Sequence, residues 1–385
     1  MITSIFLRKK IKTILILLAF CFFVGGGVLI LRADCFQALT EKVIQISFDP
    51  VENPKVQLVV GGDIMLSRGI GWWAKKEGYD RSFSGENYHP LSQFPCYASW
   101  DCLLYFNLES MFSLKDNDQP KGGFLFRANT GNIQALLDLR GGNELLLSLA
   151  NNHTNNAGAA GVELTRSRLA AHNIGFFWAG NSTWEAQTIF QTTKNWIQLC
   201  FQAFSYDGTS GIYGGKTLAW NPLDLALMTG TLQEMEKKGC ELRILGLHRG
   251  AEYRFQPNKK QIELAHQLID AGADMIFGGH SHVPWAYENY QGKPIFYSFG
   301  NFLFDQERGK RATGKEFNYT YDYELKRKTV PTYIPLLASL EIEKTESWIQ
   351  ISDPLFKMAR LNKGIFAPLD QETFSGLMAE LTIKN

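Results

Sequence analysis

Residues 273–282, ADMIFGGHSH, contain the pattern that decides the fold. The first five residues, ADMIF (273–277), form a short apolar run of the length of a buried strand. Two glycines and a His-x-His pair follow without a spacer, Gly278-Gly279-His280-Ser281-His282. In open α/β sheets, ligands bind beyond the carboxyl ends of the strands. A strand that runs directly into two histidines therefore predicts an α/β fold with a site at that edge.

The same arrangement recurs at four other apolar runs. Polar groups follow each run at once: Gly61-Gly62-Asp63 after 56–60, Asn107-Leu108-Glu109 after 102–106, Asn151-Asn152-His153 after 144–150, and His248-Arg249 after 242–247. Because the carboxyl ends of parallel strands meet at one edge of a sheet, we expect these side chains to lie close together.

Short apolar runs alternate with amphipathic stretches from Val56 onward, which is typical of α/β architecture. Two further strands are expected at IQLCFQAF (197–204) and PIFYSF (294–299). Helices are expected at 158–172 and at 257–271, where proline occupies the first turn and Ala271-Gly272 ends the helix.

The composition excludes several classes of protein. The chain has 385 residues, of which 45% are hydrophobic and 20% charged, and this rules out a disordered, collagen-like or coiled-coil protein. Residues 1–33 carry five of the 39 basic residues and no acid, so the rest has 34 basic and 38 acidic residues. That balance argues against nucleic acid as a partner, since binding phosphates requires a basic face. Six cysteines are too few for a disulfide scaffold.

The N-terminus predicts a membrane anchor. Thr13–Leu31 is a 19-residue run without a charge, close to the length that crosses a bilayer as a helix. Four basic residues precede it: Arg8, Lys9, Lys10 and Lys12. By the positive-inside rule, residues 1–35 form a cytoplasmic tail and a single transmembrane span. We therefore expect a single-pass inner-membrane protein whose large domain lies outside the cytoplasm.

Two alternatives to an anchor are a cleaved signal peptide and a lipoprotein. The apolar run exceeds the usual core of a signal peptide, and Leu31-Arg32-Ala33 is a poor cleavage site. Cys21 and Cys35 follow Phe20 and Asp34, where a lipoprotein requires a small residue. An uncleaved anchor therefore agrees best with the sequence.

Three other segments complete the organisation. Residues 36–55 have no periodicity and contain Asp-Pro and Asn-Pro breaks, so we expect a linker. Residues 306–330 hold seven basic and four acidic residues and no apolar pattern. They are either a flexible solvated insertion or a surface for an anionic polymer or lipid head group. Cys96 and Cys102 are either a disulfide or two buried thiols, and the sequence leaves both open.

The residues at the strand ends suit a transition metal. Three imidazoles, two carboxylates and an amide oxygen favour Zn²⁺, Mn²⁺ or Fe²⁺ over Ca²⁺ or Mg²⁺ alone. Each signal also has a plain structural explanation: Gly-Gly-Asp as a turn, the asparagines of 151–155 as a helix cap, and Glu109 as a partner of an arginine. Together and in this order, they predict a metal site. The other histidines, His89, His172 and His266, are expected to be structural or exposed.

The order Gly-Asp, Asn-Leu-Glu, Asn-Asn-His, His-x-Gly-x-Glu and Gly-x-His-x-His resembles the CapA family of capsule and poly-γ-glutamate synthesis proteins. That family is similar to the calcineurin-like metallophosphoesterases. The resemblance spans about Val56–Asp305 and is longest over 149–180 and 247–306. It implies a four-layer α/β/β/α sandwich over 56–305, with metals at the sheet edge. Residues 306–385 are then a C-terminal extension that packs on this domain.

The resemblance also implies roles for single residues. Asp63 and His282 would hold one metal, Asn152, His248 and His280 the other, and Glu109 would bridge them. His153 takes the place of the histidine that contacts the phosphate or leaving group. Asp63-Ile64-Met65 departs from the Asp-x-His of phosphoesterases, so the first metal lacks one ligand.

Arg249 stands where relatives often have tryptophan. Its planar guanidinium suits a bidentate contact with phosphate, and the alternative is an ion pair with Glu252.

These roles imply a membrane-anchored hydrolase of phosphate esters that uses one or two Mn, Fe or Zn ions. Two alternatives remain. The first is a non-catalytic accessory subunit that binds an anionic polymer beside the polymer synthase or export subunits. The second is a metal-dependent amide hydrolase that acts on the polymer.

Overall fold

The computed structural model describes residues 53–78, 82–83, 88–118, 124–178, 180, 182–205, 223–254, 256–284, 286–306, 321–322, 327–328 and 332–381. The described residues from Pro54 onward belong to one compact unit. The predicted span 13–31 lies outside the described residues, as do most of the linker 36–55 and of the insertion 306–330. None of the described helices is both long and apolar enough to cross a bilayer.

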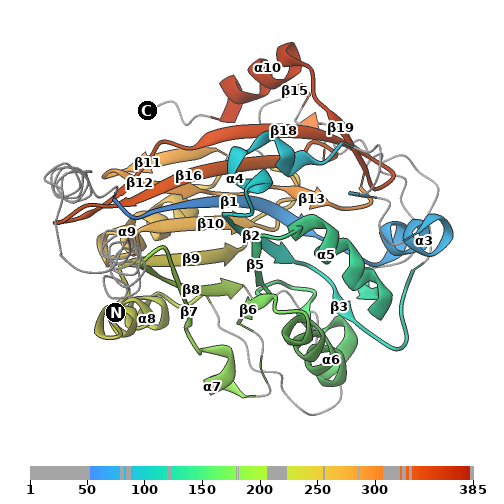
Figure 1. Cartoon of the computed structure of the whole chain (residues 1–385), viewed down its shortest axis with the longest axis horizontal. Helices are drawn as coiled ribbons and strands as arrows, with labels where there is room; N and C mark the ends of the chain where they lie inside the picture. The colour runs from blue at the N-terminus through green and yellow to red at the C-terminus, as the bar shows by residue number, and fades with distance from the viewer. Residues whose placement is uncertain are drawn as a thin grey trace, which may run out of the picture. The chain divides into compact units, whose positions relative to one another are not determined.

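The first sheet has β1 (Lys55–Ile64) at its centre (Figure 1). On one side follow three strands, all parallel to β1: β2 (Cys102–Leu108), β5 (Glu144–Ser148) and β6 (Gly175–Phe177). On the other side lie three strands joined antiparallel: β16 (Leu336–Lys344), β18 (Leu355–Asn362) and β19 (Ile365–Pro368). Two short strands are attached, β13 (Asn301–Leu303) to β1 and β17 (Ile349–Ile351) to β16.

The second sheet has four parallel strands between two antiparallel edges. The parallel strands are β8 (Ile197–Ser205), β9 (Leu242–His248), β10 (Met275–Gly279) and β12 (Lys293–Phe296). The edges are β7 (Phe190–Lys194) and β11 (Tyr287–Tyr290). Two small pairs stand apart: β3 (Met111–Phe112) with β4 (Arg127–Ala128), and β14 (Tyr321–Asp322) with β15 (Arg327–Lys328).

Four helices connect successive parallel strands: α5 (Ile133–Arg140), α6 (Gly158–Ala171), α8 (Leu225–Lys237) and α9 (Lys259–Asp270). The remaining helices are α3 (Arg68–Glu77), α4 (Pro95–Ala98), α7 (Thr183–Ala186) and α10 (Gln371–Leu381), with short 3₁₀ turns at 90–93, 130–132 and 154–157. α9 begins with a capping box, in which the Asn258 side chain accepts from the Gln261 N–H and Gln261 reaches back to the Asn258 N–H.

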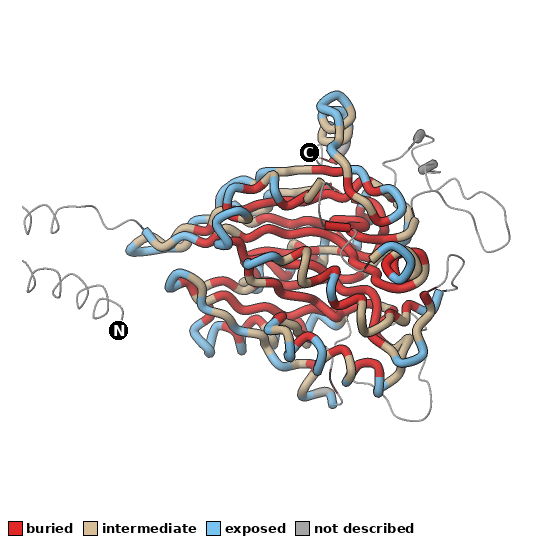
Figure 2. The backbone as a smooth tube through the Cα atoms, turned by 45° about the vertical axis from the view of Figure 1, so that its right-hand side comes forward, coloured by how far each residue is buried: buried red, intermediate tan, exposed pale blue. Residues whose placement is uncertain are grey.

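The two sheets pack face to face through an aromatic core. The ring of Tyr105 on β2 lies 6.0 Å from Phe201 on β8 and 5.1 Å from Phe277 on β10. Because the inner faces cover each other, the connecting helices lie on the outer faces. Figure 2 shows the buried residues concentrated along the strands of both sheets. The predicted α/β class is confirmed, and each of the seven predicted strands and two predicted helices has a counterpart in the structure.

The C-terminal residues are part of the first sheet. β16 pairs with β1 along most of its length, from Lys55↔Glu343 to Gly61↔Leu337. Residues 336–368 therefore extend the main sheet, where the sequence predicted an extension packed on the domain. Sequence periodicity reveals a strand but not its partner, so this antiparallel pairing could not be predicted.

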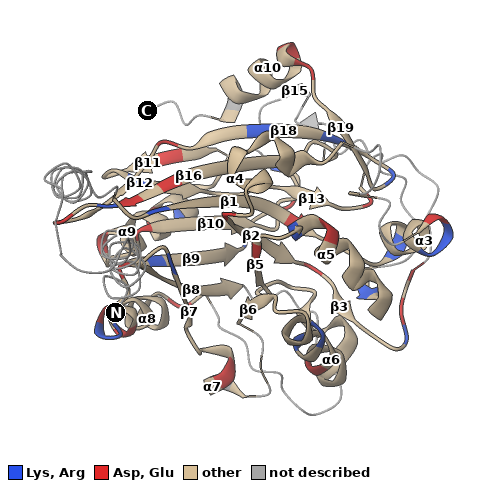
Figure 3. Cartoon of the chain, in the orientation of Figure 1, with Lys and Arg blue, Asp and Glu red and all other residues tan. Residues whose placement is uncertain are grey.

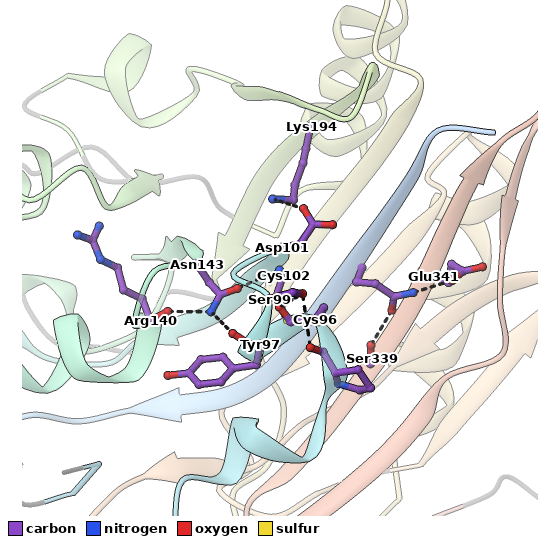
Figure 4. The surroundings of a disulfide bond; sticks show 12 residues. Cys96, Tyr97, Ser99, Asp101, Cys102, Arg140, Asn143, Lys194, Ser339 and Glu341 are labelled. Carbon is purple, nitrogen blue, oxygen red and sulfur yellow. Dashed lines mark hydrogen bonds and ion pairs between the residues drawn. A yellow bond between two sulfur atoms is a disulfide. The ribbon is translucent and has the colours of Figure 1, made fainter. Parts of the chain in front are cut away.

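Two disulfides tie the loops to this framework. Cys96 and Cys102, whose Cα atoms are 5.0 Å apart, close the loop before β2 (Figure 4). Of the two states that the sequence left open for this pair, the structure contains the disulfide. Cys200 on β8 bonds to Cys240, which follows α8, with Cα atoms 5.7 Å apart. The second bond was not predicted, because nothing local links cysteines 40 residues apart.

Gly62 allows β1 to approach β13 closely. A Cβ at this position would lie 1.9 Å from the carbonyl oxygen of Gly300. The register of β1 against β2 also shifts between Val60 and Asp63. A bulge of this kind re-aims the side chain that follows it, which here is Asp63.

Gly62→Ala should therefore lower the free energy of unfolding by about 1–3 kcal/mol or more, because a backbone carbonyl cannot rotate away from the added methyl group. Gly230→Ala is the matched control, since its Cβ on the exposed face of α8 meets nothing within 4 Å. The control should gain roughly 0.5–1 kcal/mol. Denaturant unfolding of both variants tests this, and a Gly62→Ala chain as stable as wild type would contradict the close approach.

Candidate metal centre

The ends of β1, β2, β9 and β10 bring polar side chains into two overlapping groups. In each group the ligand atoms lie within 4.8 Å of one another: Glu109, His248 and His280 in one, and Asp63, Glu109 and His282 in the other. Glu109 is shared. The Oδ1 of Asn152, which follows β5, lies 3.0 Å from Nε2 of His248. The structure thus gathers all six residues predicted as ligands.

Backbone and side-chain hydrogen bonds fix Asp63. Its N–H donates to Gly300 O at 2.8 Å. Asn107 Nδ2 donates to Asp63 Oδ1 at 2.8 Å, and the His280 N–H lies 3.3 Å from Oδ2. Asn151 in turn donates to the Asn107 oxygen at 3.2 Å. The carboxylate is therefore held by side chains from β2 and from the loop after β5.

The His-x-His segment has unusual backbone geometry. His280 and His282 have φ values of +89° and +60°, in the left-handed region that side chains other than glycine rarely adopt. The buried Ser281 between them donates from Oγ to the Val283 carbonyl at 2.6 Å. Strain of this kind persists where the surrounding structure enforces it, which is typical of functional sites.

The two carboxylates are buried against each other. Burial raises the pKa of Asp63 to about 7. Burial, followed by the negative charge of Asp63, raises the pKa of Glu109 well above its usual value. Neither carboxylate oxygen of Glu109 has a hydrogen-bond partner, although the side chain is fully buried. A divalent cation would favour the charged form of both carboxylates, so the donor set fits a metal.

The imidazoles are in the form that binds metals. Burial is the main cause that lowers the pKa of His280 to about 4 and that of His282 to about 3, and it lowers the pKa of His248 well below its usual value. Neutral imidazole is the ligating form. Asn301 Oδ1 lies 2.8 Å from His282 Nδ1, while the Asn301 amide donates to Gln306 and to the Thr332 carbonyl. His282 Nδ1 therefore donates, and its Nε2 lone pair is available to a metal.

His153 lies beside the cluster with a defined orientation. Its Nδ1 is 2.8 Å from Asn156 Oδ1, which also accepts from the Phe126 N–H at 2.7 Å. Nδ1 therefore carries the proton, and Nε2 lies 3.8 Å from Glu109 Oε1. The Phe126 ring stacks on the imidazole at 3.7 Å between centroids. Burial lowers the pKa of His153 to about 4.

Arg249 follows His248 directly, but its guanidinium forms no hydrogen bond or ion pair with the proposed metal ligands in the described part of the chain. Its N–H donates to Gly279 O at 3.3 Å, and its guanidinium interacts with Tyr297. Among the described residues, no ion pair joins it to Glu252 or to the cluster. Its role in contacting phosphate stays a prediction.

Sequence reasoning missed a second arginine, Arg68. Its guanidinium makes a bidentate ion pair with Asp305. The same group lies 4.7 Å from the centroid of Phe126 and 5.7 Å from that of Phe304. Its positive charge acts on Glu109, whose pKa it lowers against the larger effect of burial. The partners are 237 residues apart, so no local signal could have linked them.

Three asparagines that support the cluster were also missed as site residues: Asn107, Asn151 and Asn301. A signal existed for the last, because Gly300-Asn301 directly follows the predicted strand 294–299. Met65, which stands where phosphoesterases have histidine, is buried, and its sulfur accepts from Ser67 Oγ at 3.0 Å.

The other histidines have structural contacts. His89 Nε2 lies 2.9 Å from Tyr97 Oη, and His266 stacks on Tyr290 and lies 2.9 Å from Glu288. His172 is the half-buried residue that ends α6.

Comparison with known proteins finds a family match over a range that includes all six candidate ligands. The family model described as "Bacterial capsule synthesis protein PGA_cap" matches residues 57–306. The capsule biosynthesis protein CapA of Bacillus anthracis is 27% identical over 259 residues, which are 66% of this chain and 61% of that protein. The PGA biosynthesis protein CapA of Bacillus subtilis is 30% identical over 248 residues, 64% of this chain and 62% of that one. The chain spans less than two thirds of the length of these relatives.

A third relative, named as a probable polyglutamine synthesis accessory protein of Mycobacterium tuberculosis, is 27% identical over 66% of this chain and 76% of its own. Among solved structures, the calcineurin-like phosphoesterase YfkN of Bacillus subtilis is similar with a TM-score of 0.44 and 13% identity, over 86% of this chain and 97% of that one. A phosphatase from Mycoplasma pneumoniae gives a TM-score of 0.45 and 12% identity, over 82% and 95%.

Proposed function

Since the chain belongs to the PGA_cap family of bacterial capsule synthesis proteins, we propose that it is a CapA-type accessory protein of capsule or poly-γ-glutamate synthesis whose buried cluster hydrolyses phosphate esters with a divalent metal. The names of the Bacillus relatives, a capsule biosynthesis protein and a PGA biosynthesis protein, support the process. The buried cluster of candidate metal ligands supports metal-dependent hydrolysis.

One observation carries the chemical part of the proposal. Glu109 is fully buried beside Asp63, and neither of its carboxylate oxygens has a hydrogen-bond partner. Three imidazoles with lowered pKa values surround the pair. A divalent cation would stabilise the charged form of both carboxylates, and the neutral histidines offer lone pairs to the same ion.

Asp63 and His282 would hold one ion, and Asn152, His248 and His280 a second, with Glu109 shared between them. This mixture of nitrogen and oxygen donors favours Mn, Fe or Zn. A divalent cation supplies Lewis-acid polarisation of phosphoryl oxygens.

His153 is placed to deliver a proton from Nε2 to the leaving oxygen of the ester. Its Nδ1 carries a proton in both the neutral and the charged ring, so the bond to Asn156 keeps the imidazole oriented throughout. An anionic phosphoryl group beside the ring would raise the pKa of His153 from about 4 toward neutrality. Phe126 covers one face of the ring and limits the access of water.

A purely accessory role is the second candidate, and the name of the mycobacterial relative favours it. The polymer would then be bound beside the synthase or export subunits without bond cleavage. Amide hydrolysis of the polymer with the same metal site is a further alternative, because polarised carbonyl and phosphoryl groups need similar ligands.

Turnover assays on the full-length chain separate these candidates. The proposal predicts hydrolysis of a phosphomonoester or phosphodiester probe that stops after chelation and returns when Mn, Fe or Zn is added. Release of glutamate from poly-γ-glutamate, with no phosphate released, would favour the amide hydrolase. A metal-loaded chain that turns over neither substrate would contradict the catalytic proposal and favour the accessory role.

We also propose that the chain is a single-pass protein of the inner membrane with residues 36–385 outside the cytoplasm. The charge-free run at 13–31 supports this, and so do the two disulfides, which persist in oxidising compartments. Protease added to spheroplasts should digest the large domain, and a domain protected until lysis would contradict this topology.

A further inference from the structure

At the end of the sandwich where β1 begins, three turns contact one another or the first residues of that strand. Lys344 N donates to Pro54 O at 2.9 Å, and Asn195 Nδ2 donates to Lys55 O at 2.8 Å. Lys344 Nζ lies 3.2 Å from the carbonyl oxygen of Trp196. Lys194 pairs with Asp101 at 3.4 Å, which adds the loop before β2 (Figure 4).

Three exposed tryptophans lie on these turns. Trp100, Trp196 and Trp348 are 70%, 48% and 65% exposed, and we refer to them as the tryptophan end. Trp100 is in the loop closed by the Cys96–Cys102 disulfide, Trp196 is in the β7–β8 turn, and Trp348 is in the turn between β16 and β17. Among the described residues one more tryptophan is strongly exposed, Trp184 on α7, which lies outside these turns.

Backbone geometry gives no reason for tryptophan at two of these positions. Trp100 and Trp196 have φ values of +59° and +68°, and Asn195 has +46°. Lys194 pairs with Ile197, so Asn195 and Trp196 form a two-residue hairpin turn with both φ values positive. Such turns favour Asn-Gly, and a large side chain in place of glycine is unfavourable there. The turn geometry therefore does not explain the tryptophan at position 196.

We propose that the tryptophan end lies in the head-group layer of the bilayer, which orients the domain with its metal centre away from the membrane. The proposal rests on the membrane anchor proposed above. Tryptophan is enriched at the interface of membranes, where its ring is partly in apolar surroundings and its N–H stays hydrated.

The predicted span would tether the described unit within reach of a bilayer. The predicted span ends at Leu31, and the described unit begins at Pro54, next to Lys344. Residues 32–54 could cover up to about 80 Å when extended, so the connection alone does not fix which face meets the membrane. The tryptophans supply that orientation.

The lysines at this end are paired with acidic residues, and the exposed Glu346 lies on the same turn as Trp348. Lys55 pairs with Glu341 at 2.9 Å, and Lys344 pairs with Glu241 at 2.6 Å. Figure 3 shows basic and acidic residues close together along the paired strands β1 and β16. With the lysines paired, the tryptophans are the feature that distinguishes this surface.

The metal centre lies at the other end of the same strand. Asp63 follows Lys55 by eight residues of β1, or about 26 Å at 3.3 Å per residue. A domain that contacts the bilayer through its tryptophan end therefore holds the metal centre on the face turned away from the membrane.

Photolabelling of the full-length chain tests this orientation. The chain, with p-benzoylphenylalanine in place of Trp196 or Trp348, is reconstituted into liposomes of phosphatidylethanolamine and phosphatidylglycerol that contain radiolabelled lipid. The same substitution at Trp184 and at Phe124 gives matched controls, because both residues are strongly exposed and lie on other parts of the unit. Positions 196 and 348 should take up at least about tenfold more lipid, since interfacial rings lie about 5–10 Å into the head-group region and the controls lie in water.

A carbonate wash of the same samples tests the proposed membrane anchor separately from the proposed contact of the tryptophan end with lipid. Equal lipid labelling at 184 and 196 in a carbonate-resistant chain would overturn the tryptophan end and leave the anchor intact. So would crosslinking of position 196 to a second copy of the chain. A chain that carbonate removes but that still labels lipid at 196 would contradict the anchor alone, and loss of both signals would contradict both.

The melting temperature of a variant tests whether the Trp196 ring instead serves to stabilise the hairpin. Trp196→Gly should retain the melting temperature of wild type or raise it, because glycine fits the positive φ. A large loss of thermal stability in this variant would show that Trp196 is there to hold the hairpin, and would overturn its assignment to the membrane.

Discussion

Glu109→Leu is expected to remove the metal from the protein and to abolish metal-dependent turnover. Glu109 belongs to both candidate ligand groups, so its loss would weaken an ion held by either group. The affinity for metal should fall by more than the roughly 10–100-fold that the loss of an outer-shell partner costs. Elemental analysis and a titration with Mn²⁺ measure this fall, and a variant that binds metal as tightly as wild type would remove Glu109 from the site.

The same variant should be more stable than wild type when both are free of metal. In wild type, the buried carboxylate of Glu109 has no hydrogen-bond partner and lies beside Asp63. Removing a buried polar group that has no hydrogen-bond partner should stabilise the metal-free chain by about 1–3 kcal/mol. Thermal unfolding with a chelator should therefore rank Glu109→Leu above wild type. Added metal should reverse the order, because it stabilises only the chain that binds it.

His153→Ala is expected to separate catalysis from metal binding. The variant should keep most of its metal, because the ligands come from other residues. Turnover of a phosphate-ester probe should fall by roughly 10²–10⁴-fold, the span that a general acid contributes. The local fold should survive, since Asn156 Oδ1 still accepts from the Phe126 N–H.

His266→Ala serves as the control for this experiment, because His266 lies on α9 and contacts Tyr290 and Glu288. It should leave both metal content and turnover unchanged. A His153→Ala chain with the turnover of wild type, or one that restores polymer fully in a deletion strain while the wild-type chain turns over no probe, would favour the accessory role.

Much of the site could be predicted because its ligands follow apolar runs. His280 and His282 come directly after the buried run 273–277, and Asp63 comes after 56–60. Parallel strands deliver such residues to one edge, so the gathering of the cluster follows from local patterns. Asn301 obeys the same rule after 294–299 and was within reach of the same reasoning.

The rest depends on contacts that join distant parts of the chain. The pair of Arg68 with Asp305 and the pairing of β16 with β1 both link residues more than 200 positions apart. The bulge before Asp63 and the close approach of Gly62 to Gly300 lie side by side, and no local sequence pattern predicts either. Periodicity shows which residues are buried but not which element buries them.

Metal content tests the central claim most directly. The full-length chain, purified without chelator, should contain about one to two equivalents of Mn, Fe or Zn, as expected for a site with two ligand groups. His248→Ala should lower that content, because His248 lies within reach of both Asn152 and Glu109. His266→Ala should not change it. Equal metal content in wild type and both variants, or a wild-type chain that holds no metal after incubation with these ions, would contradict the assignment.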